Sequence, residues 1–144
     1  MSEPKNAEIK KGRLLSTIKF PIRWGDMDSL GHVNNAQYLR YFEESRVDWT
    51  QRSGLLLHSE GEGMILLKAS VTYKKSVVYP ANVSIDLFAG AIGRTSLNMI
   101  NELTIEGDDT PAATGEFVIV WFDYIAQKPA PVPQRLRDLL EGRA

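Results

Sequence analysis

The chain contains no cysteine, which excludes a disulfide framework, a thiol nucleophile and metal binding through cysteine. Its two histidines, His32 and His58, are too few and too far apart in the sequence to predict a zinc site. It also lacks an apolar run that would suit a secretory signal or a membrane span. The net charge of −1 lacks the basic excess typical of nucleic-acid binders. We therefore expect a cytoplasmic protein without metal, cofactor, nucleic-acid partner or membrane partner.

The length and composition of the chain are those of one ordinary globular domain. The chain has 144 residues, of which 43 % are hydrophobic and 24 % are charged, so it can bury one core of substantial size. We predict a disordered polar leader over residues 1–13 and a folded domain over residues 14–127. Residues 128–144 begin with a proline-rich segment, which predicts an extended linker, and Gln134 to Glu141 are predicted to form a short helix.

The first half of the chain predicts a strand followed by a long helix. Apolar and polar side chains alternate from Leu14 to Trp24, the pattern of a strand with one buried face. From Ala36 to Arg52 the apolar positions recur every three or four residues, as on a helix that lays one side on a core. Gly54 is the expected helix stop. The predicted core stripe of this helix consists of Tyr38, Tyr41, Phe42, Ser45 and Trp49.

The second half predicts four consecutive strands. From Gly63 the pattern alternates, which places one apolar face on Ile65, Leu67, Ala69, Val71 and Tyr73. Three more strands are predicted, with turn signals between them, over Ala81–Ala91, Thr95–Glu106 and Ala112–Tyr124. The last of these is apolar on both faces, which predicts a central position in the sheet or a subunit contact. One strand, one helix and four strands predict an α+β fold, with an antiparallel sheet wrapped around the helix.

The loop Arg23–Asn35 concentrates chemically active side chains just ahead of the predicted helix. It contains two carboxylates, a histidine and two asparagines. A helix N-terminus carries backbone N–H groups without intrahelical partners, and these donors suit a carbonyl oxygen that gains negative charge. A carboxylate in this loop would therefore place a base beside an oxyanion site.

Three segments resemble the hot-dog-fold thioesterases of the 4-hydroxybenzoyl-CoA thioesterase and acyl-CoA thioesterase family. They are the aromatic-Gly-Asp-x-Asp run at Trp24–Asp28, the Gly-His-Val-Asn-Asn run at Gly31–Asn35, and the helix core Tyr38–Arg46. The resemblance extends from Thr17 to Tyr124. It implies a hot-dog fold, in which an antiparallel five-stranded sheet wraps around one long helix. It also implies acyl-CoA hydrolysis without a cofactor, in a homodimer or homotetramer with active sites at the dimer interface.

Residue by residue, the resemblance implies Asp28 as the catalytic group, acting as general base on water or as nucleophile. If the resemblance is set aside, Asp28 is expected to be an Asx-turn or capping residue. Asn35 would polarise the thioester carbonyl through its backbone N–H, with its side chain as a helix N-cap. Some relatives carry histidine or tyrosine here, so only the backbone role carries over. His32 resembles a loop-shaping residue near the substrate, and Arg94 falls near the family's basic turn that contacts phosphate.

Several neighbouring residues have simpler interpretations. Asp26 is expected to be structural and to fix the loop by accepting backbone hydrogen bonds. Glu43 and Arg46 are three apart on the helix and are expected to form an ion pair. Lys74 and Lys75 are weaker candidates for contact with the phosphates of coenzyme A, and a solvated surface role is an equal expectation.

Two other functions compete with hydrolysis. The first is that of a hot-dog enoyl-thioester hydratase, but such enzymes resemble a Gly-Asp-x-Asn-Pro-x-His pattern, whose proline and histidine are missing at the corresponding spacing here. The second is that of a non-catalytic acyl-thioester binding protein, which the intact Asp28 disfavours. Acyl-chain length, aromatic preference and the choice between coenzyme A and acyl-carrier protein are left open.

Overall fold

The computed structural model describes residues 10–55, 58–59 and 61–143. Most of the predicted leader therefore lies outside the described residues. These residues form seven strands, a short 3-10 turn and two helices. In chain order they are β1 (Leu14–Pro21), η1 (Trp24–Asp26), α1 (Asn35–Arg52), β2 (His58–Ser59), β3 (Glu62–Tyr73), β4 (Asn82–Ile92), β5 (Ser96–Ile105), β6 (Ala113–Asp123), β7 (Lys128–Pro129) and α2 (Gln134–Glu141).

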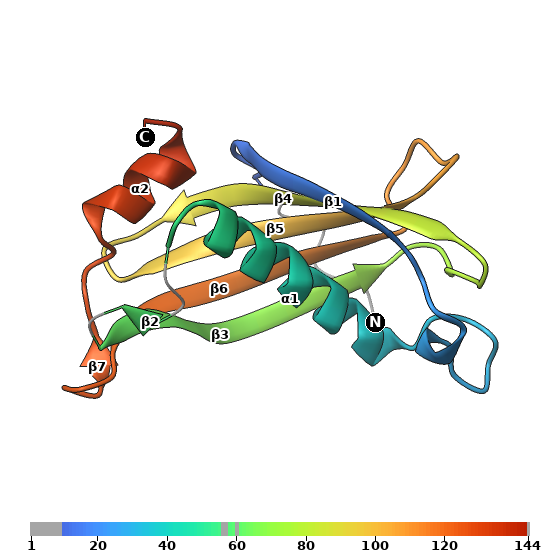
Figure 1. Cartoon of the computed structure of the whole chain (residues 1–144), viewed down its shortest axis with the longest axis horizontal. Helices are drawn as coiled ribbons and strands as arrows, with labels where there is room; N and C mark the ends of the chain where they lie inside the picture. Colours follow the sequence, from blue (N-terminus) through green and yellow to red (C-terminus); the bar gives the residue numbers. More distant parts are fainter. Residues whose placement is uncertain (1–9, 56–57, 60, 144) are drawn as a thin grey trace, which may run out of the picture.

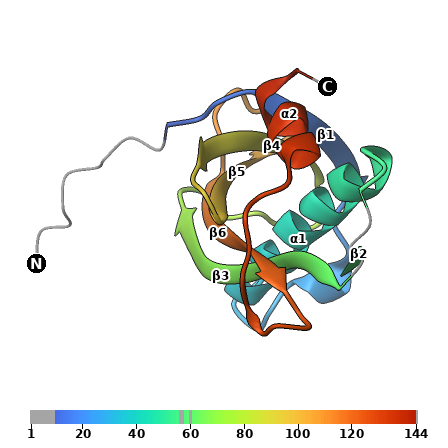
Figure 2. The same cartoon turned by 90° about the vertical axis from the view of Figure 1, so that its left-hand side faces the viewer.

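The strands form one antiparallel sheet in the order β1-β4-β5-β6-β3-β2, and β7 pairs with β6. The sheet curls around α1, which lies along its inner face (Figures 1 and 2). The predicted architecture of five long strands around one helix is confirmed, with β2 and β7 as two-residue additions. Strand β6 lies between β5 and β3, so the predicted central position is also confirmed.

Helix α1 packs the predicted stripe into the core. Tyr38, Tyr41, Phe42, Ser45 and Trp49 are all buried. The helix ends at Arg52 with Ser53 as its C-cap, and Gly54 follows with φ of +72°, a left-handed conformation that glycine adopts without strain. The prediction that Gly54 stops this helix is therefore confirmed.

The first strand is shorter than the alternation predicts. It ends at Pro21, and Trp24 begins the turn η1 instead of continuing the apolar face. Asp26 causes the difference, because its side chain accepts a hydrogen bond from the backbone N–H of Arg23 at 3.0 Å and closes the turn. Trp24 is consequently exposed, so its predicted place on the buried face is wrong.

A bulge interrupts the predicted apolar face of β3. Leu66 pairs with Ile119 and Lys68 pairs with Val118, so Leu67 is an extra residue in the ladder. Leu66 and Ala69, on either side of the bulge, both line the groove against α1. The prediction that Leu67 shares a face with Ala69 is therefore wrong, because the bulge reverses the alternation.

The C-terminal segment packs on the same core as the sheet. Helix α2 spans the predicted residues and buries Leu136 and Leu140 in a cluster that includes Trp49 and Trp121. Backbone N–H groups of the preceding segment bond to Trp121 and Arg94. No helix in the described part of the chain is both long and apolar enough to cross a bilayer.

Candidate active site

The loop between β1 and α1 is held in place by Asp26. This buried carboxylate accepts a hydrogen bond of 2.6 Å from the hydroxyl of Tyr41 and one of 3.0 Å from the backbone N–H of Arg23. Its own backbone carbonyl accepts from the N–H of Asn34 at 3.0 Å. The loop is thus tied to the body of α1 and to the start of the helix, which confirms the structural interpretation of Asp26.

Asp28 lies in the tight turn that follows. Its Oδ1 accepts a hydrogen bond of 2.9 Å from the backbone N–H of Leu30, which is an Asx-turn, and its Oδ2 lies 3.4 Å from Nδ2 of Asn34. Gly31 closes the turn at φ of +82°. Asp28 therefore does form the Asx-turn that is common for an aspartate before a helix. The turn uses only Oδ1 of the carboxylate, and Oδ2 is held by one long hydrogen bond.

The start of α1 offers one free backbone donor. Asn34 is the N-cap, because its side chain accepts from the N–H of Ala36 at 2.9 Å and its carbonyl accepts from Gln37. The expectation that Asn35 provides the cap is therefore wrong by one residue. Asn35 is the first residue of the helix, and its N–H has no hydrogen-bond partner among the described residues. This donor sits at the positive end of the helix dipole.

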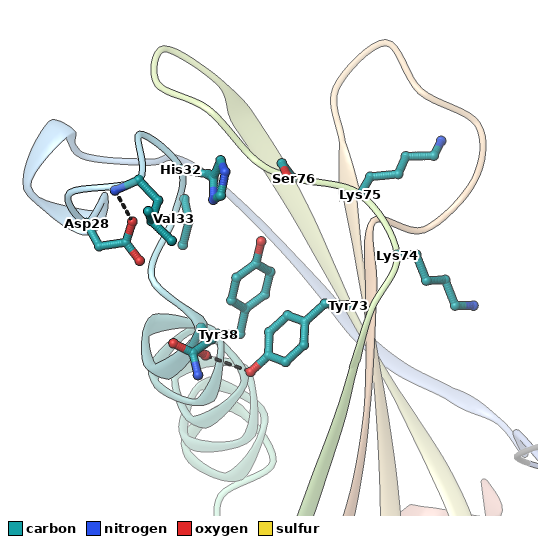
Figure 3. Close-up of a pocket in the computed structure, with 10 residues that line it drawn as sticks. Asp28, His32, Val33, Tyr38, Tyr73, Lys74, Lys75 and Ser76 are labelled. Atoms are coloured by element: carbon teal, nitrogen blue, oxygen red, sulfur yellow. Dashed lines mark hydrogen bonds between the residues drawn. The ribbon is translucent and has the colours of Figure 1, made fainter. Parts of the chain in front are cut away.

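An open cavity of about 340 Å³ brings these groups together at the end of the sheet where β3 stops. Figure 3 shows Asp28 and His32 on one wall and Tyr73 on the other, with the phenol of Tyr73 directed at the start of α1. That hydroxyl donates to the carbonyl of Asn35 at 2.8 Å. The lining residues are Asp28, Leu30, His32, Val33, Asn35, Tyr38, Tyr73, Lys74, Lys75 and Ser76.

Three tyrosines pack beneath and beside the cavity. The rings of Tyr38 and Tyr73 meet edge to face at 5.0 Å, and the ring of Tyr41 lies 6.2 Å from that of Tyr38. Burial raises the pKa of all three, and for Tyr41 the hydrogen bond to Asp26 raises the pKa further. These phenols therefore stay neutral at physiological pH, and those of Tyr41 and Tyr73 donate hydrogen bonds.

The structure brings three of the four predicted site residues to this cavity. Asp28, His32 and Asn35 all line it, and the backbone carbonyl of His32 accepts from the N–H of Asp28 at 3.1 Å. Lys74 and Lys75 line it as well, but their side chains point away from Asp28 (Figure 3). Lys75 binds Oγ1 of Thr110 at 2.6 Å, so its charge is directed toward another turn.

Arg94 is the predicted site residue that does not join the others within one chain. It follows β4 at the end of the sheet occupied by α2, and its carbonyl accepts from the N–H of Val132. The loop with Asp28 lies at the opposite end (Figure 1).

The predicted ion pair between Glu43 and Arg46 is wrong, because Glu43 pairs with Arg40 at 2.9 Å instead.

Tyr38 and Tyr73 line the cavity, and Asn34 lies next to it through its contact with Asp28, although the sequence does not single out any of the three as a site residue. Asn34 belongs to the Gly-His-Val-Asn-Asn run, and the signal that identifies it is its position two residues before Ala36, whose N–H it caps. Tyr38 was assigned to the core, where it also packs. Tyr73 was assigned to an apolar strand face, and its role depends on where β3 ends relative to α1.

Comparison with known proteins assigns the chain to a family. The sequence profile of the Thioesterase-like superfamily matches residues 22–140. The solved structure of the PA2801 protein from Pseudomonas aeruginosa is 40% identical, with a TM-score of 0.81 over 87% of this chain and 97% of that one. The long-chain acyl-CoA thioesterase FadM of Escherichia coli (strain K12) is 24% identical over 83% of this chain and 92% of its own length.

A more distant structure shares the fold. Slr0204, a 1,4-dihydroxy-2-naphthoyl-CoA thioesterase from Synechocystis, has 19% identity and a TM-score of 0.79, over 86% of this chain and 93% of that one. Together with the sheet wrapped around α1, these matches confirm the hot-dog fold and the expectation of a thioester-hydrolysing enzyme. The chain belongs to the Thioesterase-like superfamily.

Proposed function

We propose that this thioesterase hydrolyses an acyl-CoA to the free acid and coenzyme A, with Asp28 as the catalytic carboxylate. One observation carries the proposal: Asp28 lines the same cavity as Asn35, whose N–H has no partner among the described residues. A thioester carbonyl bound between them would have a base on one side and a hydrogen-bond donor at the positive end of α1 on the other.

The reaction then needs only groups of this chain and one water molecule. As a general base, Asp28 takes a proton from water while the oxygen attacks the thioester carbon, and the carbonyl oxygen becomes an oxyanion at the Asn35 N–H. The oxyanion collapses, the C–S bond breaks, and the thiolate of coenzyme A leaves. As a nucleophile, Asp28 attacks the carbon itself and forms a mixed anhydride, which water then hydrolyses.

The homodimer expected for this family has a natural contact in β3. Beyond Gly63 this strand is hydrogen-bonded on one side only, by β6, within the described part of the chain. Leu66 and Leu67 on this open edge are 47% and 68% exposed. Such an edge is a template for pairing with another strand. A second copy that pairs antiparallel along β3, related by a two-fold axis, would cover it.

This pairing also gives Arg94 a role. An antiparallel two-fold places the β4–β5 turn of one subunit at the same end of the dimer as Asp28 of the other. Arg94 would then supply positive charge near the phosphates of a coenzyme A bound at the partner's cavity. His32 would shape the wall of that cavity beside the acyl group. Assembly of dimers into tetramers and a cytoplasmic location stay predictions.

The test is thiol release from a panel of short, medium, long and aromatic acyl-CoAs, because the named relatives act on long-chain and on naphthoyl thioesters. We expect release from at least one, and Asp28→Asn should lower kcat by roughly a hundredfold or more. Glu44→Gln, an exposed carboxylate on α1, is the matched control and should keep the wild-type rate. A wild-type enzyme without activity, or an Asp28→Asn enzyme at full rate, would refute the mechanism.

The same panel separates the competing functions. A hydratase would remove the enoyl absorbance of crotonyl-CoA without releasing thiol, whereas a binding protein would retain acyl-CoA unchanged. A single turnover in ¹⁸O-labelled water tests for the anhydride route of Asp28. Label in the peptide that contains Asp28 identifies the anhydride, whereas label in the product alone fits both the general base and an anhydride that water attacks at the acyl carbon.

A further inference from the structure

A groove lies along the contact between α1 and β3, and it begins one residue after the active-site cavity's Asn35. It consists of two cavities of about 300 and 210 Å³, which share Glu43, Arg46 and Leu66. The first begins at Ala36, directly after the free amide of Asn35. Apart from its charged members, the groove is lined by apolar side chains and one threonine, namely Ala36, Leu39, Ala69 and Phe117 in the first cavity and Val47, Thr50, Met64, Met99 and Ile119 in the second, with Leu66 in both.

Arg46 lies at the junction of the two cavities and has no ion-pair partner within the described part of the chain. One face of its guanidinium packs over the ring of Phe117, with 4.2 Å between Cζ and the ring centroid. Its Nη1 is buried and has no hydrogen-bond partner, and its side chain forms no ion pair among the described residues. The nearby carboxylate of Glu43 is engaged by Arg40. Burial lowers the pKa of Arg46, and Glu43 opposes that shift only as a neighbouring charge.

The position of Arg46 matches the far end of an acyl group that starts at Asn35. Eleven residues of helix separate the two, which corresponds to roughly 16 Å along the axis at about 1.5 Å per residue. Side chains on a helix lean toward its N-terminus, so the guanidinium lies closer to Asn35 than that. A long side chain with five N–H donors in such a groove is suited to bind an oxygen acceptor, above all a carboxylate or a phenolic oxygen.

We infer that Arg46 selects acyl groups that carry a hydrogen-bond-accepting oxygen at the end remote from the thioester. This inference rests on the proposed acyl-CoA hydrolysis and specifies its substrate class. An unsubstituted acyl chain leaves the guanidinium desolvated without a partner, whereas a distal carboxylate or hydroxyl supplies one. Selectivity then comes from the cost of the unpaired cation as well as from the contact itself.

The experiment compares matched pairs of substrates that differ only at the distal end. One set pairs ω-carboxyacyl-CoAs of six, eight and ten carbons with the plain acyl-CoAs of the same length, and another pairs 4-hydroxybenzoyl-CoA with benzoyl-CoA. In at least one pair the wild-type enzyme should prefer the oxygen-bearing member by tenfold or more in kcat/KM. Arg46→Met should reduce that ratio at least tenfold, chiefly through KM, and Arg46→Lys should retain part of it. Arg52→Met, which removes a charge from the exposed end of α1, should keep the wild-type ratio.

Binding of non-hydrolysable thioether analogues, measured by calorimetry, repeats the comparison without catalysis. If wild type releases no thiol, the proposed function fails, but a distal-oxygen preference in binding that Arg46→Met removes still supports the role of Arg46. The inference is overturned if no pair shows a preference, or if Arg46→Met leaves the ratios unchanged. It is also overturned if the variant weakens dimerisation and all substrates equally, because Arg46 would then serve a subunit contact.

Discussion

The hydroxyl of Tyr41 donates a 2.6 Å hydrogen bond to Oδ2 of Asp26, a residue in the loop that precedes the helix on which Tyr41 lies. Both side chains are buried. The bond fastens the loop with Asp28 to the body of α1, so the position of the proposed base depends on the helix interior.

Removal of this bond by Tyr41→Phe should lower the free energy of unfolding by about 2 kcal/mol, because a buried carboxylate loses a donor. The looser loop should also lower kcat. Urea denaturation and steady-state kinetics measure the two effects. Tyr79→Phe removes a hydroxyl from an exposed tyrosine and should change stability by less than about 0.5 kcal/mol. Equal stability of the two variants would contradict the anchoring role.

Asn34 should affect stability and rate through different atoms. Its Oδ1 caps α1, and its Nδ2 faces Asp28. Asn34→Ala should lose about 1 kcal/mol of stability, whereas Asn34→Ser keeps a capping oxygen and should recover most of it. Both lack the amide donor, so both should lose about tenfold in kcat through misplacement of Asp28. Thermal denaturation and thiol-release kinetics separate the roles, and wild-type kcat in Asn34→Ser would limit Asn34 to capping.

Alkaline pH should unfold the protein before the tyrosines at the site ionise. Burial raises the pKa of Tyr38, Tyr41 and Tyr73 above the value of about 10 for an unfolded tyrosine. Their neutral forms therefore contribute stability in full below pH 10, and that contribution is lost as pH rises above it. In a Tyr79→Phe, Tyr124→Phe variant these three are the remaining tyrosines. Their tyrosinate absorbance should appear together with loss of far-UV circular dichroism, and ionisation near pH 10 in a folded protein would contradict this.

The open edge of β3 predicts how the proposed dimer can be broken. Leu67→Asp places a charge on the exposed edge, outside the groove between α1 and β3, and should raise the dissociation constant by about thirtyfold or more, close to 2 kcal/mol. Activity should fall with the loss of the partner's contribution to the site. Sedimentation velocity over a concentration series measures the shift. Ile125→Asp, at another exposed position, should leave the equilibrium unchanged. An unchanged dimer in Leu67→Asp would place the contact elsewhere.

The long elements of this fold could be predicted from the sequence because each is a regular pattern of several residues. The stripe from Tyr38 to Trp49 matches the buried face of α1. Alternation also located β4, β5 and β6 to within one or two residues. The two-residue strands β2 and β7 are too short to produce a period. The bulge at Leu67 was missed because its residue is apolar, as the alternation required.

The segment that forms the site could be predicted from the sequence, but the contacts of its individual atoms could not. Asn34 and Asn35 are the same residue type, so the sequence alone does not reveal which of them caps the helix. Glu43 has an arginine three residues away on either side, and the choice of Arg40 depends on side-chain rotamers. The distance of Arg94 from Asp28 follows from strand order, a long-range property that no local pattern encodes.

The side chain of Arg13 reaches the carbonyl of Leu139 at 3.2 Å, so the beginning of the first strand and the last helix share one corner of the molecule. A short peptide could join these two segments without crossing the groove or the loop of Asp28. Circular permutation is therefore a practical route to new variants, with fresh termini opened at the exposed turn of Gly107 and Asp108. Such a rearranged enzyme would carry its termini, and any protein fused to them, at the turn between β5 and β6 instead of at the corner beside α2.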